Sequence, residues 1–150
     1  NRTIKFRGKR IDNGEWVYGY LFFDFNCADE YVPFIIWKDN SYLGGTGEEV
    51  VEEETIGQFT GLYDENGKEI YEGDIIEFSY DVFTGNFDTK VGRGTIEFID
   101  GAFYIKPFEI EGKKIKDIDN EEWFLIYTVN IDTLKVIGNI YDNPDLVVKE

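Results

Sequence analysis

The feature that most constrains the fold is a pair of tight-turn signals, each set between segments in which apolar and polar residues alternate. Asn13-Gly14 lies between two such segments near the start of the chain, and Asp100-Gly101 lies between two others. Asn, Asp and Gly supply the positive φ angles that short β-hairpin turns need. Alternation with a period of two places one set of side chains on a single face of a strand. The sequence therefore predicts antiparallel β-hairpins.

The N-terminal hairpin is expected over residues 3–23, with its turn at Asp12-Asn13-Gly14. Its second strand carries an aromatic residue at every other position from Trp16 to Phe22, which predicts that these side chains share one face. The apolar run at 31–37 has the length of a strand, and Pro33 indicates that this strand begins at the edge of a sheet.

The rest of the chain predicts further short strands joined by turns. A turn is expected at 64–67, an extended piece at Ile70-Tyr71 and a loop at 81–90. Strands are expected at 75–80, 91–99, 103–107, 123–129 and 134–141. Five short strands in succession are typical of a small barrel or roll of the SH3 type.

Little helix is expected. The charged stretch 111–121 is interpreted as a loop or a short helix, and Asn143-Pro144 as an N-cap followed by a single helical turn. We therefore expect an all-β fold, an SH3-type barrel or roll with an additional N-terminal β-hairpin. Residues 1–150 are expected to form one domain, with the hairpin and its extension at 1–57, the barrel core at 58–142 and a tail at 143–150.

Length and composition predict a protein that folds without disulfide bonds or a structural metal ion. A chain of 150 residues buries roughly 70% of its unfolded surface, and 42% of these residues are hydrophobic. The single cysteine, Cys27, cannot form an intramolecular disulfide, which favours a reducing cytoplasm. The sequence has no apolar run near 18 residues, so no membrane segment is expected. No cofactor is expected either.

The charge is strongly acidic and unevenly placed. With 15 basic and 31 acidic residues the formal net charge is −16, which disfavours contact with nucleic-acid phosphates and anionic membranes. The first ten residues contain no acid and carry five basic residues: Arg2, Lys5, Arg7, Lys9 and Arg10. Either this basic strand pairs with the acidic surface of the same chain, or it forms an edge that binds an anion or a partner.

The residues needed for common catalytic chemistry are missing, so no enzyme is expected. Histidine is absent, which removes the usual general base and every zinc site with a histidine ligand. The two serines, Ser41 and Ser79, lie outside any nucleophile-elbow motif, and Cys27 has no base beside it in sequence. Asp74 and Glu77 form a carboxylate pair able in principle to transfer protons or bind a hard cation, but acidic residues are too numerous for this to be specific.

Two segments resemble ligand-binding loops without meeting their requirements. The glycine-rich loop at 44–47 lacks the lysine of a phosphate-binding loop and is followed by Glu48 and Glu49. The segment beginning at Asp64 resembles the start of a calcium loop, but Ile75 stands where the closing bidentate glutamate would be needed. A flexible loop and a solvated turn are the favoured interpretations.

Several longer segments resemble the YopX family of phage and prophage proteins. They are Ile4 to Arg10 (IKFRGKR), Gly14 to Gly19 (GEWVYG), Gly57 to Leu62 (GQFTGL), Asn66 to Ile75 (NGKEIYEGDI) and Val136 to Tyr141 (VIGNIY). The resemblance covers nearly the whole chain. It implies an SH3-type β architecture, a phage or prophage origin in a bacterial host and possible homo-oligomers, and it supplies no catalytic residues.

A candidate interaction surface is expected beside the segment from Gln58 to Asp74. Four residues there mix polar and aromatic groups on turns, and two basic residues come from the N-terminal strand. The candidates are Gln58, Thr60, Tyr71, Asp74, Arg7 and Arg10.

Three functions are compatible with this sequence. The leading hypothesis is a non-enzymatic module that binds a phage protein, a host protein or another copy of itself. The alternative is an acidic decoy that imitates DNA and occupies a host DNA-binding protein. The least favoured is an enzyme that uses carboxylates and a metal, which requires several acidic side chains converging in one pocket.

Overall fold

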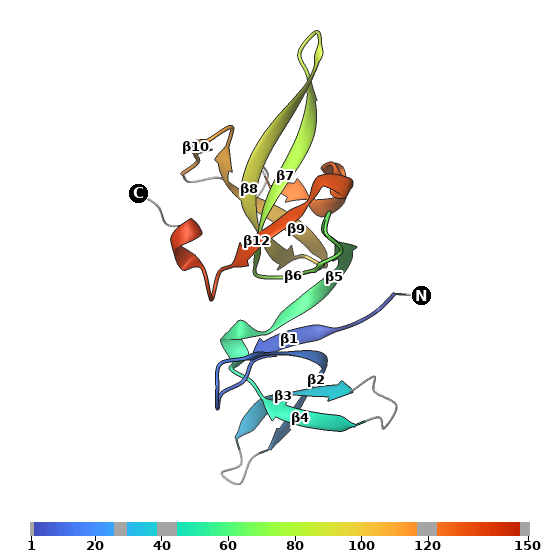
Figure 1. Cartoon of the computed structure of the whole chain (residues 1–150), viewed down its shortest axis with the longest axis vertical. Helices are drawn as coiled ribbons and strands as arrows, with labels where there is room; N and C mark the ends of the chain where they lie inside the picture. The colour runs from blue at the N-terminus through green and yellow to red at the C-terminus, as the bar shows by residue number, and fades with distance from the viewer. Residues whose placement is uncertain (1, 26–29, 39–44, 117–122, 148–150) are drawn as a thin grey trace. The chain divides into compact units, whose positions relative to one another are not determined.

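The computed structural model describes residues 2–25, 30–38, 45–116 and 123–147 (Figure 1). The chain forms two compact units, Asn1–Gly61 and Leu62–Glu150. Helical structure in the described residues is limited to 3₁₀ turns of three residues each. The predicted all-β class is therefore confirmed, while the SH3-type closure and the assignment of all 150 residues to one domain stay predictions.

The first unit is built on an antiparallel sheet. Its strands are β1 (Phe6–Lys9), β2 (Trp16–Phe25), β3 (Tyr31–Lys38), β4 (Thr46–Val50) and β5 (Gly57–Tyr63), with the 3₁₀ turn η1 (Glu53–Thr55) before β5. The strand order is β4-β3-β2-β1-β5, continuing to β6 (Glu69–Tyr71) after the chain passes into the second unit. Strands β1 and β2 pair antiparallel, so the predicted N-terminal hairpin is confirmed.

The core of the first unit follows from the alternation along these strands. In register, Gly8 pairs with Val17 and Leu21 pairs with Ile35, so the side chains of Val17, Leu21 and Ile35 lie on one face of the sheet. The buried residues of this face are Val17, Ile35 and Val51, with Phe6, Leu21, Trp37 and Ile56 packed against them.

The second unit contains the larger sheet. Its strands are β7 (Asp74–Phe83), β8 (Phe87–Ile99), β9 (Ala102–Ile110), β10 (Lys113–Lys114), β11 (Phe124–Leu125) and β12 (Lys135–Asn139). The order is β10-β9-β8-β7-β12, and β11 pairs with β9. Three 3₁₀ turns complete the unit: η3 (Ile126–Thr128), η4 (Ile131–Thr133) and η5 (Pro144–Leu146).

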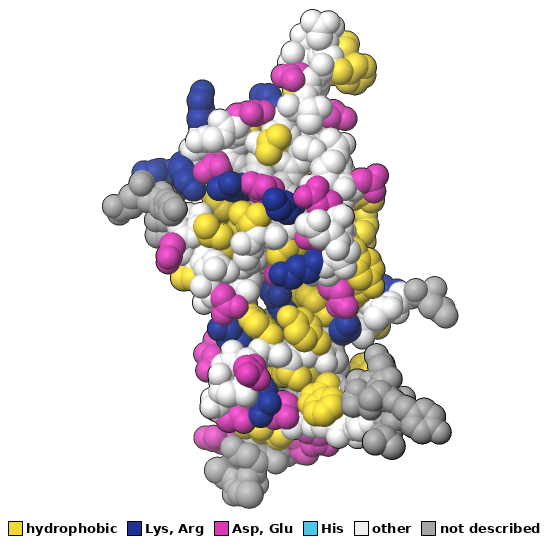
Figure 2. All heavy atoms as spheres, viewed as in Figure 1, with side chains coloured by type: hydrophobic (Ala, Val, Ile, Leu, Met, Phe, Trp, Pro, Cys, Tyr) yellow, Lys and Arg dark blue, Asp and Glu magenta, His cyan; other side chains and the backbone are white. Residues whose placement is uncertain are grey.

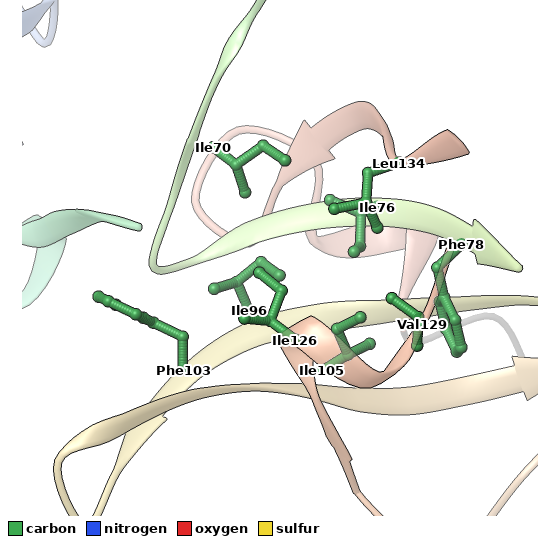
Figure 3. Packing of buried hydrophobic residues seen from close by; sticks show 9 residues of the cluster. All are labelled: Ile70, Ile76, Phe78, Ile96, Phe103, Ile105, Ile126, Val129 and Leu134. Carbon is green, nitrogen blue, oxygen red and sulfur yellow. The ribbon is translucent and has the colours of Figure 1, made fainter. Parts of the chain in front are cut away.

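The core of the second unit lies between the β7–β9 strands and the segment that carries η3 and η4 (Figure 3). Its nine buried members are Ile70, Ile76, Phe78, Ile96, Phe103, Ile105, Ile126, Val129 and Leu134. Most are β-branched or aromatic, the types that pack well on a pleated surface. Ile76 and Phe78 point inward from β7 at a spacing of two, as the alternation predicts.

The two predicted hairpin turns have different conformations. At Asp100-Gly101 both residues have positive φ, 50° and 82°, as a two-residue type I′ turn requires. In the N-terminal hairpin only Gly14 has positive φ, 71°, and the loop is longer, closed by the hydrogen bond from Arg10 N–H to Glu15 O at 2.9 Å. The prediction was correct about the position of both hairpins and wrong about the kind of turn in the first.

Two sequence predictions for local structure are wrong. The loop expected at 81–90 is instead the outer part of a long hairpin, in which β7 and β8 pair up to Phe83 and Phe87. The strand expected at 123–129 is two residues of β11 followed by the 3₁₀ turn η3. Glu48 and Glu49, which follow the glycine-rich loop, lie on β4, where Glu48 is exposed.

Other sequence predictions fall partly or wholly on undescribed residues. Cys27, most of the charged stretch after 116 and the start of the glycine loop at 44 lie outside the described part of the chain. The helical turn at Pro144 is confirmed as η5, but Asn143 makes no N-cap bond to it: its Oδ1 accepts the N–H of Asn139 instead, at 3.2 Å.

Candidate functional site

The two arginines of the predicted surface lie in the first unit and contact their own neighbours. Arg7 is buried, and its guanidinium carbon lies 4.5 Å from the ring centre of Trp16. Arg10 forms ion pairs with Asp12 at 2.7 Å and with Glu49 at 3.2 Å. The hydrogen bond from Arg10 lowers the pKa of Asp12 below its ordinary value. Arg10 therefore pairs with acidic residues of its own chain, which is the first of the two alternatives for the basic strand.

Gln58 and Thr60 lie on β5. Gln58 is half-buried and is in register with Phe6, while Thr60 is buried. Because β1 and β5 are neighbouring strands, Arg7 and Gln58 are close along the sheet.

Tyr71 and Asp74 are brought together in the second unit, where both are buried. Asp74 Oδ2 accepts the backbone N–H of Tyr71 at 2.8 Å, and the Tyr71 hydroxyl donates to Glu69 Oε2 at 2.6 Å. These bonds stabilise the turn between β6 and β7. Asp74 and Glu77 do not form the carboxylate pair considered above: an odd spacing puts them on opposite faces of β7, and Glu77 binds Arg93. The predicted surface as a whole stays a prediction.

Asp64 has a role that its resemblance to a calcium ligand does not indicate. Its Oδ1 accepts the N–H groups of Asn66 and Lys68, both at 2.9 Å, and its Oδ2 accepts the N–H of Val136 at 3.1 Å. Glu65 N–H donates to Leu134 O at 2.8 Å beside it. The turn expected at 64–67 is thus confirmed, but its first residue is buried and fastens the turn to the start of β12.

Two phenyl rings at the end of the β7–β8 hairpin are the most exposed large hydrophobic pair in register on the described strands. Phe83 and Phe87 face each other across the last pair of the ladder, with ring centres 4.9 Å apart. They are 66% and 83% exposed. The hairpin extends beyond the other strands of its unit, and hydrophobic side chains appear at its outer end (Figures 1 and 2).

A network of polar side chains braces the stem of this hairpin. Asn130 Nδ2 donates to Ser79 Oγ at 3.2 Å and to Asp81 Oδ1 at 3.3 Å. Thr89 Oγ1 donates to the same Asp81 oxygen at 2.8 Å, across the hairpin. Ser79 Oγ also bonds Thr133 Oγ1 at 2.8 Å. The stem is therefore fixed to the η3–η4 segment up to Asp81, while residues 82–88 project beyond it.

A shallow hollow lies next to this network on the same side of the hairpin stem. Its volume is about 250 Å³, and its lining residues are Glu65, Glu77, Phe78, Ser79, Val91, Thr133 and Lys135. The tip rings, the braced stem and the hollow together form what we call the hairpin face, carried by Ser79, Asp81, Phe83, Phe87, Thr89 and Val91. Sequence reasoning missed this face because residues 81–90 were interpreted as a loop.

Two further observations concern metal binding and membrane crossing. In the part of the chain that the structure describes, no three His, Cys, Asp or Glu side chains gather in a way that could hold a metal ion. None of the described helical turns has the length and hydrophobicity that crossing a bilayer requires.

The chain is similar to a solved structure and matches a family model. No curated protein matches the chain. The crystal structure of protein EF1440 from Enterococcus faecalis matches with a TM-score of 0.51 and 22% sequence identity, covering 98% of this chain and 99% of that one. At this identity the match supports the fold alone. The family model described as YopX protein matches residues 5–148, which include most of both units and the whole hairpin face, and the chain therefore belongs to the YopX family.

Proposed function

We propose that this protein is a non-enzymatic interaction module that recognises another protein through the hairpin face. The observation that carries the proposal is the exposed pair Phe83 and Phe87 at the end of a braced hairpin. Exposure of a phenyl ring to water is unfavourable, and its burial in a partner contributes roughly 1.5–3 kcal/mol to the free energy of binding.

The way the rings are presented supports recognition by a folded partner. Aromatic side chains that fill pockets carry much of the binding energy in protein interfaces. A rigid support reduces the conformational entropy lost on binding. The bonds of Asn130 to Ser79 and Asp81 provide such a support for the stem.

The setting of this function follows from the resemblance to phage and prophage proteins. In the proposal the protein acts in the cytoplasm of a bacterial host and binds a phage or host protein, with a second copy of the chain as a further possible partner. It needs no cofactor and does not bind nucleic acid directly.

The acidic-decoy hypothesis is favoured by the net charge of −16 and by the expected phage origin. On the face that Figure 2 displays, acidic side chains of each unit are interspersed with basic and hydrophobic ones. A DNA imitation needs rows of negative charge at a regular spacing along the surface.

The proposal is tested with a double variant of the tip. The tagged protein, F83S/F87S and Y127S are each used to capture proteins from host lysate, with and without phage induction, and each captured protein is then purified and its affinity measured. Tyr127 is 61% exposed on η3 and serves as the matched loss of an exposed aromatic side chain.

We expect a protein that binds wild type and Y127S alike and binds F83S/F87S at least tenfold more weakly. Circular dichroism of the three proteins checks that all are folded. If every purified binding partner retains full affinity for F83S/F87S, the hairpin face is not the recognition surface.

A further inference from the structure

We infer that the partner of the hairpin face is a basic protein that receives Phe83 and Phe87 in an apolar pocket and places a lysine or arginine opposite Asp81. This inference rests on the proposed function and adds the chemistry of the partner. It follows from the alternation along the hairpin, the charge of the face and the shape of the surface beside it.

The register of the hairpin places a carboxylate on the same face as the rings. Phe83 pairs with Phe87 and Asp81 pairs with Thr89, so all four side chains point to one side of the ribbon. Asp81 is exposed although Thr89 and Asn130 both donate to its Oδ1. Its position is thus fixed while solvent, or a partner cation, can still reach it.

The nearest basic groups do not neutralise this face. Lys90 pairs with Tyr80 in register and therefore points to the opposite side of the ribbon. Arg93 lies further down on the same side as the rings, where it forms an ion pair with Glu77 at 2.9 Å. A partner that covers the rings consequently meets an acidic group next to them.

The shallow hollow adds polar groups along the stem without adding net charge. Its charged lining groups are Glu65, Glu77 and Lys135, and Glu77 is already paired with Arg93 at 2.9 Å. The hydroxyl groups of Ser79 and Thr133 add hydrogen-bonding capacity at its wall. A hollow of about 250 Å³ can receive a side chain from the partner.

A second copy of the chain is a poor occupant of this face. Residues 62–150 contain 9 basic and 20 acidic residues, a net charge of −11. Two copies meeting through their tips would bring two units of the same negative charge together, and this repulsion opposes association. Charge complementarity therefore favours a basic partner.

The area that the two rings can bury is too small to form a stable interface by itself. Two phenylalanine side chains bury at most roughly 500 Å², whereas a stable interface buries on the order of 1,600 Å² in total. The rings are therefore anchors, and the remaining area must come from the stem, where Val91 is half-exposed next to the hollow.

The experiment uses the full chain with p-benzoylphenylalanine in place of Phe87. Irradiation in host cells, with and without phage induction, links whatever covers the tip, and mass spectrometry identifies it. The linked protein is then purified, and its affinity for wild type, F83S/F87S, D81N, D81K and Y127S is measured over a range of salt concentrations.

We expect a protein with a basic surface around the linked site. F83S/F87S should weaken its binding about 100-fold or more, as loss of two anchors does. D81K should weaken it at least tenfold, D81N less, and Y127S should leave it unchanged. The affinity should fall as salt rises for wild type and fall less for D81N.

Other outcomes overturn the inference. A link to a second copy of the chain, a linked partner with an acidic surface, or equal affinity for D81K and wild type would each contradict it. So would flotation of the wild-type protein, but not F83S/F87S, with vesicles of phosphatidylcholine and phosphatidylglycerol, because the tip would then be a membrane anchor.

The failures of the two proposals are distinguishable. A purified partner that binds F83S/F87S as tightly as wild type leaves an interaction protein and removes the hairpin face from its mechanism. If no protein is linked at position 87 and none binds the purified chain, both the inference and the proposed function are wrong.

Discussion

At the scale of single residues, Asp64 shows how one carboxylate stabilises a turn that has few apolar contacts of its own. Burial opposes ionisation of this group, but the N–H groups of Lys68, Val136 and Asn66 lower its pKa below the ordinary value of aspartate. A carboxyl group with a lowered pKa in the folded state contributes stability above its unfolded pKa, near 4. That contribution is lost as pH falls through the folded pKa.

Replacing Asp64 by asparagine should therefore destabilise the protein at neutral pH. In either orientation the amide nitrogen faces a backbone N–H, so at least one of the three bonds is lost. We expect the free energy of unfolding at pH 7 to fall by about 2–3 kcal/mol. The difference from wild type should shrink below about pH 4, where the wild-type carboxyl group begins to take up a proton in the unfolded state.

Urea unfolding followed by tryptophan fluorescence at a series of pH values measures this effect. Asp100→Asn is the matched control, because it removes the same charge at an exposed turn residue whose φ of 50° asparagine tolerates. Equal stability of Asp64→Asn and Asp100→Asn at pH 7 would show that the three bonds contribute nothing.

Gly94 illustrates a second constraint at this scale, the close approach of two strands. A Cβ atom at this position would lie 2.6 Å from Ile105 Cγ2 and 2.7 Å from the backbone oxygen of Lys106. Because one of these atoms belongs to the backbone, β8 and β9 would have to separate. Gly94→Ala should lower the free energy of unfolding by about 1–3 kcal/mol, measured by urea unfolding, and an unchanged midpoint would contradict the packing described here.

At the scale of elements, the β7–β8 hairpin is braced at its stem by side chains from another segment. Asn130→Ala removes the two hydrogen bonds from the amide nitrogen but leaves the bond from its backbone N–H to Ser79 O. We expect amide hydrogen exchange at residues 79–90 to become several-fold faster, since each bond contributes about 0.5–1.5 kcal/mol to stability.

The rest of the unit should keep its exchange rates in this variant, because the core cluster is untouched. Thr128→Ala is a suitable control, since its hydroxyl group bonds Leu125 O at 2.7 Å, within η3, and does not contact the hairpin. Uniformly faster exchange throughout the second unit would mean that Asn130 supports the whole fold and not the stem alone.

The outer half of this hairpin also marks the limit of what the sequence could predict. Alternation and the Asp-Gly signal were enough to locate the strands around Asp100-Gly101, because there local turn chemistry and burial agree. Residues 81–90 contain Asp, Gly and Asn, and their pairing depends on the contacts Phe83–Phe87 and Thr89–Asp81, which form only after the strands meet. The hairpin face depends on those same contacts, so it could not be inferred from composition or spacing.

The predicted surface around Gln58 to Asp74 shows a second limit of prediction from sequence: residues expected to be exposed are buried. Tyr71 and Asp74 are polar or amphipathic residues at a turn, a pattern typical of exposed binding residues. In the fold they are buried and bond the turn between β6 and β7. Sequence alone does not tell which way such a side chain points, because a turn can expose it or use it as an internal hydrogen-bonding group.

At the scale of the whole molecule, the net charge of −16 opposes the compact state through mutual repulsion of carboxylates. Local ion pairs such as Arg10–Asp12 and Arg93–Glu77 act in the opposite direction, but they are partly exposed, and exposed pairs contribute about 0–1 kcal/mol each. With 31 acidic residues against 15 basic ones, acidic groups outnumber basic groups by 16. Repulsion should therefore dominate the response of the protein to salt.

Raising sodium chloride from about 0.01 M to about 1 M shortens the Debye length from roughly 30 Å to roughly 3 Å. At pH 7 we expect this to raise the melting temperature by about 3 °C or more, equivalent to about 1 kcal/mol. Near pH 4.3, the isoelectric point of the sequence, the net charge vanishes and the gain should disappear. Calorimetry at the two pH values separates the effects: a melting temperature that falls with salt at pH 7 would show that the ion pairs outweigh the repulsion.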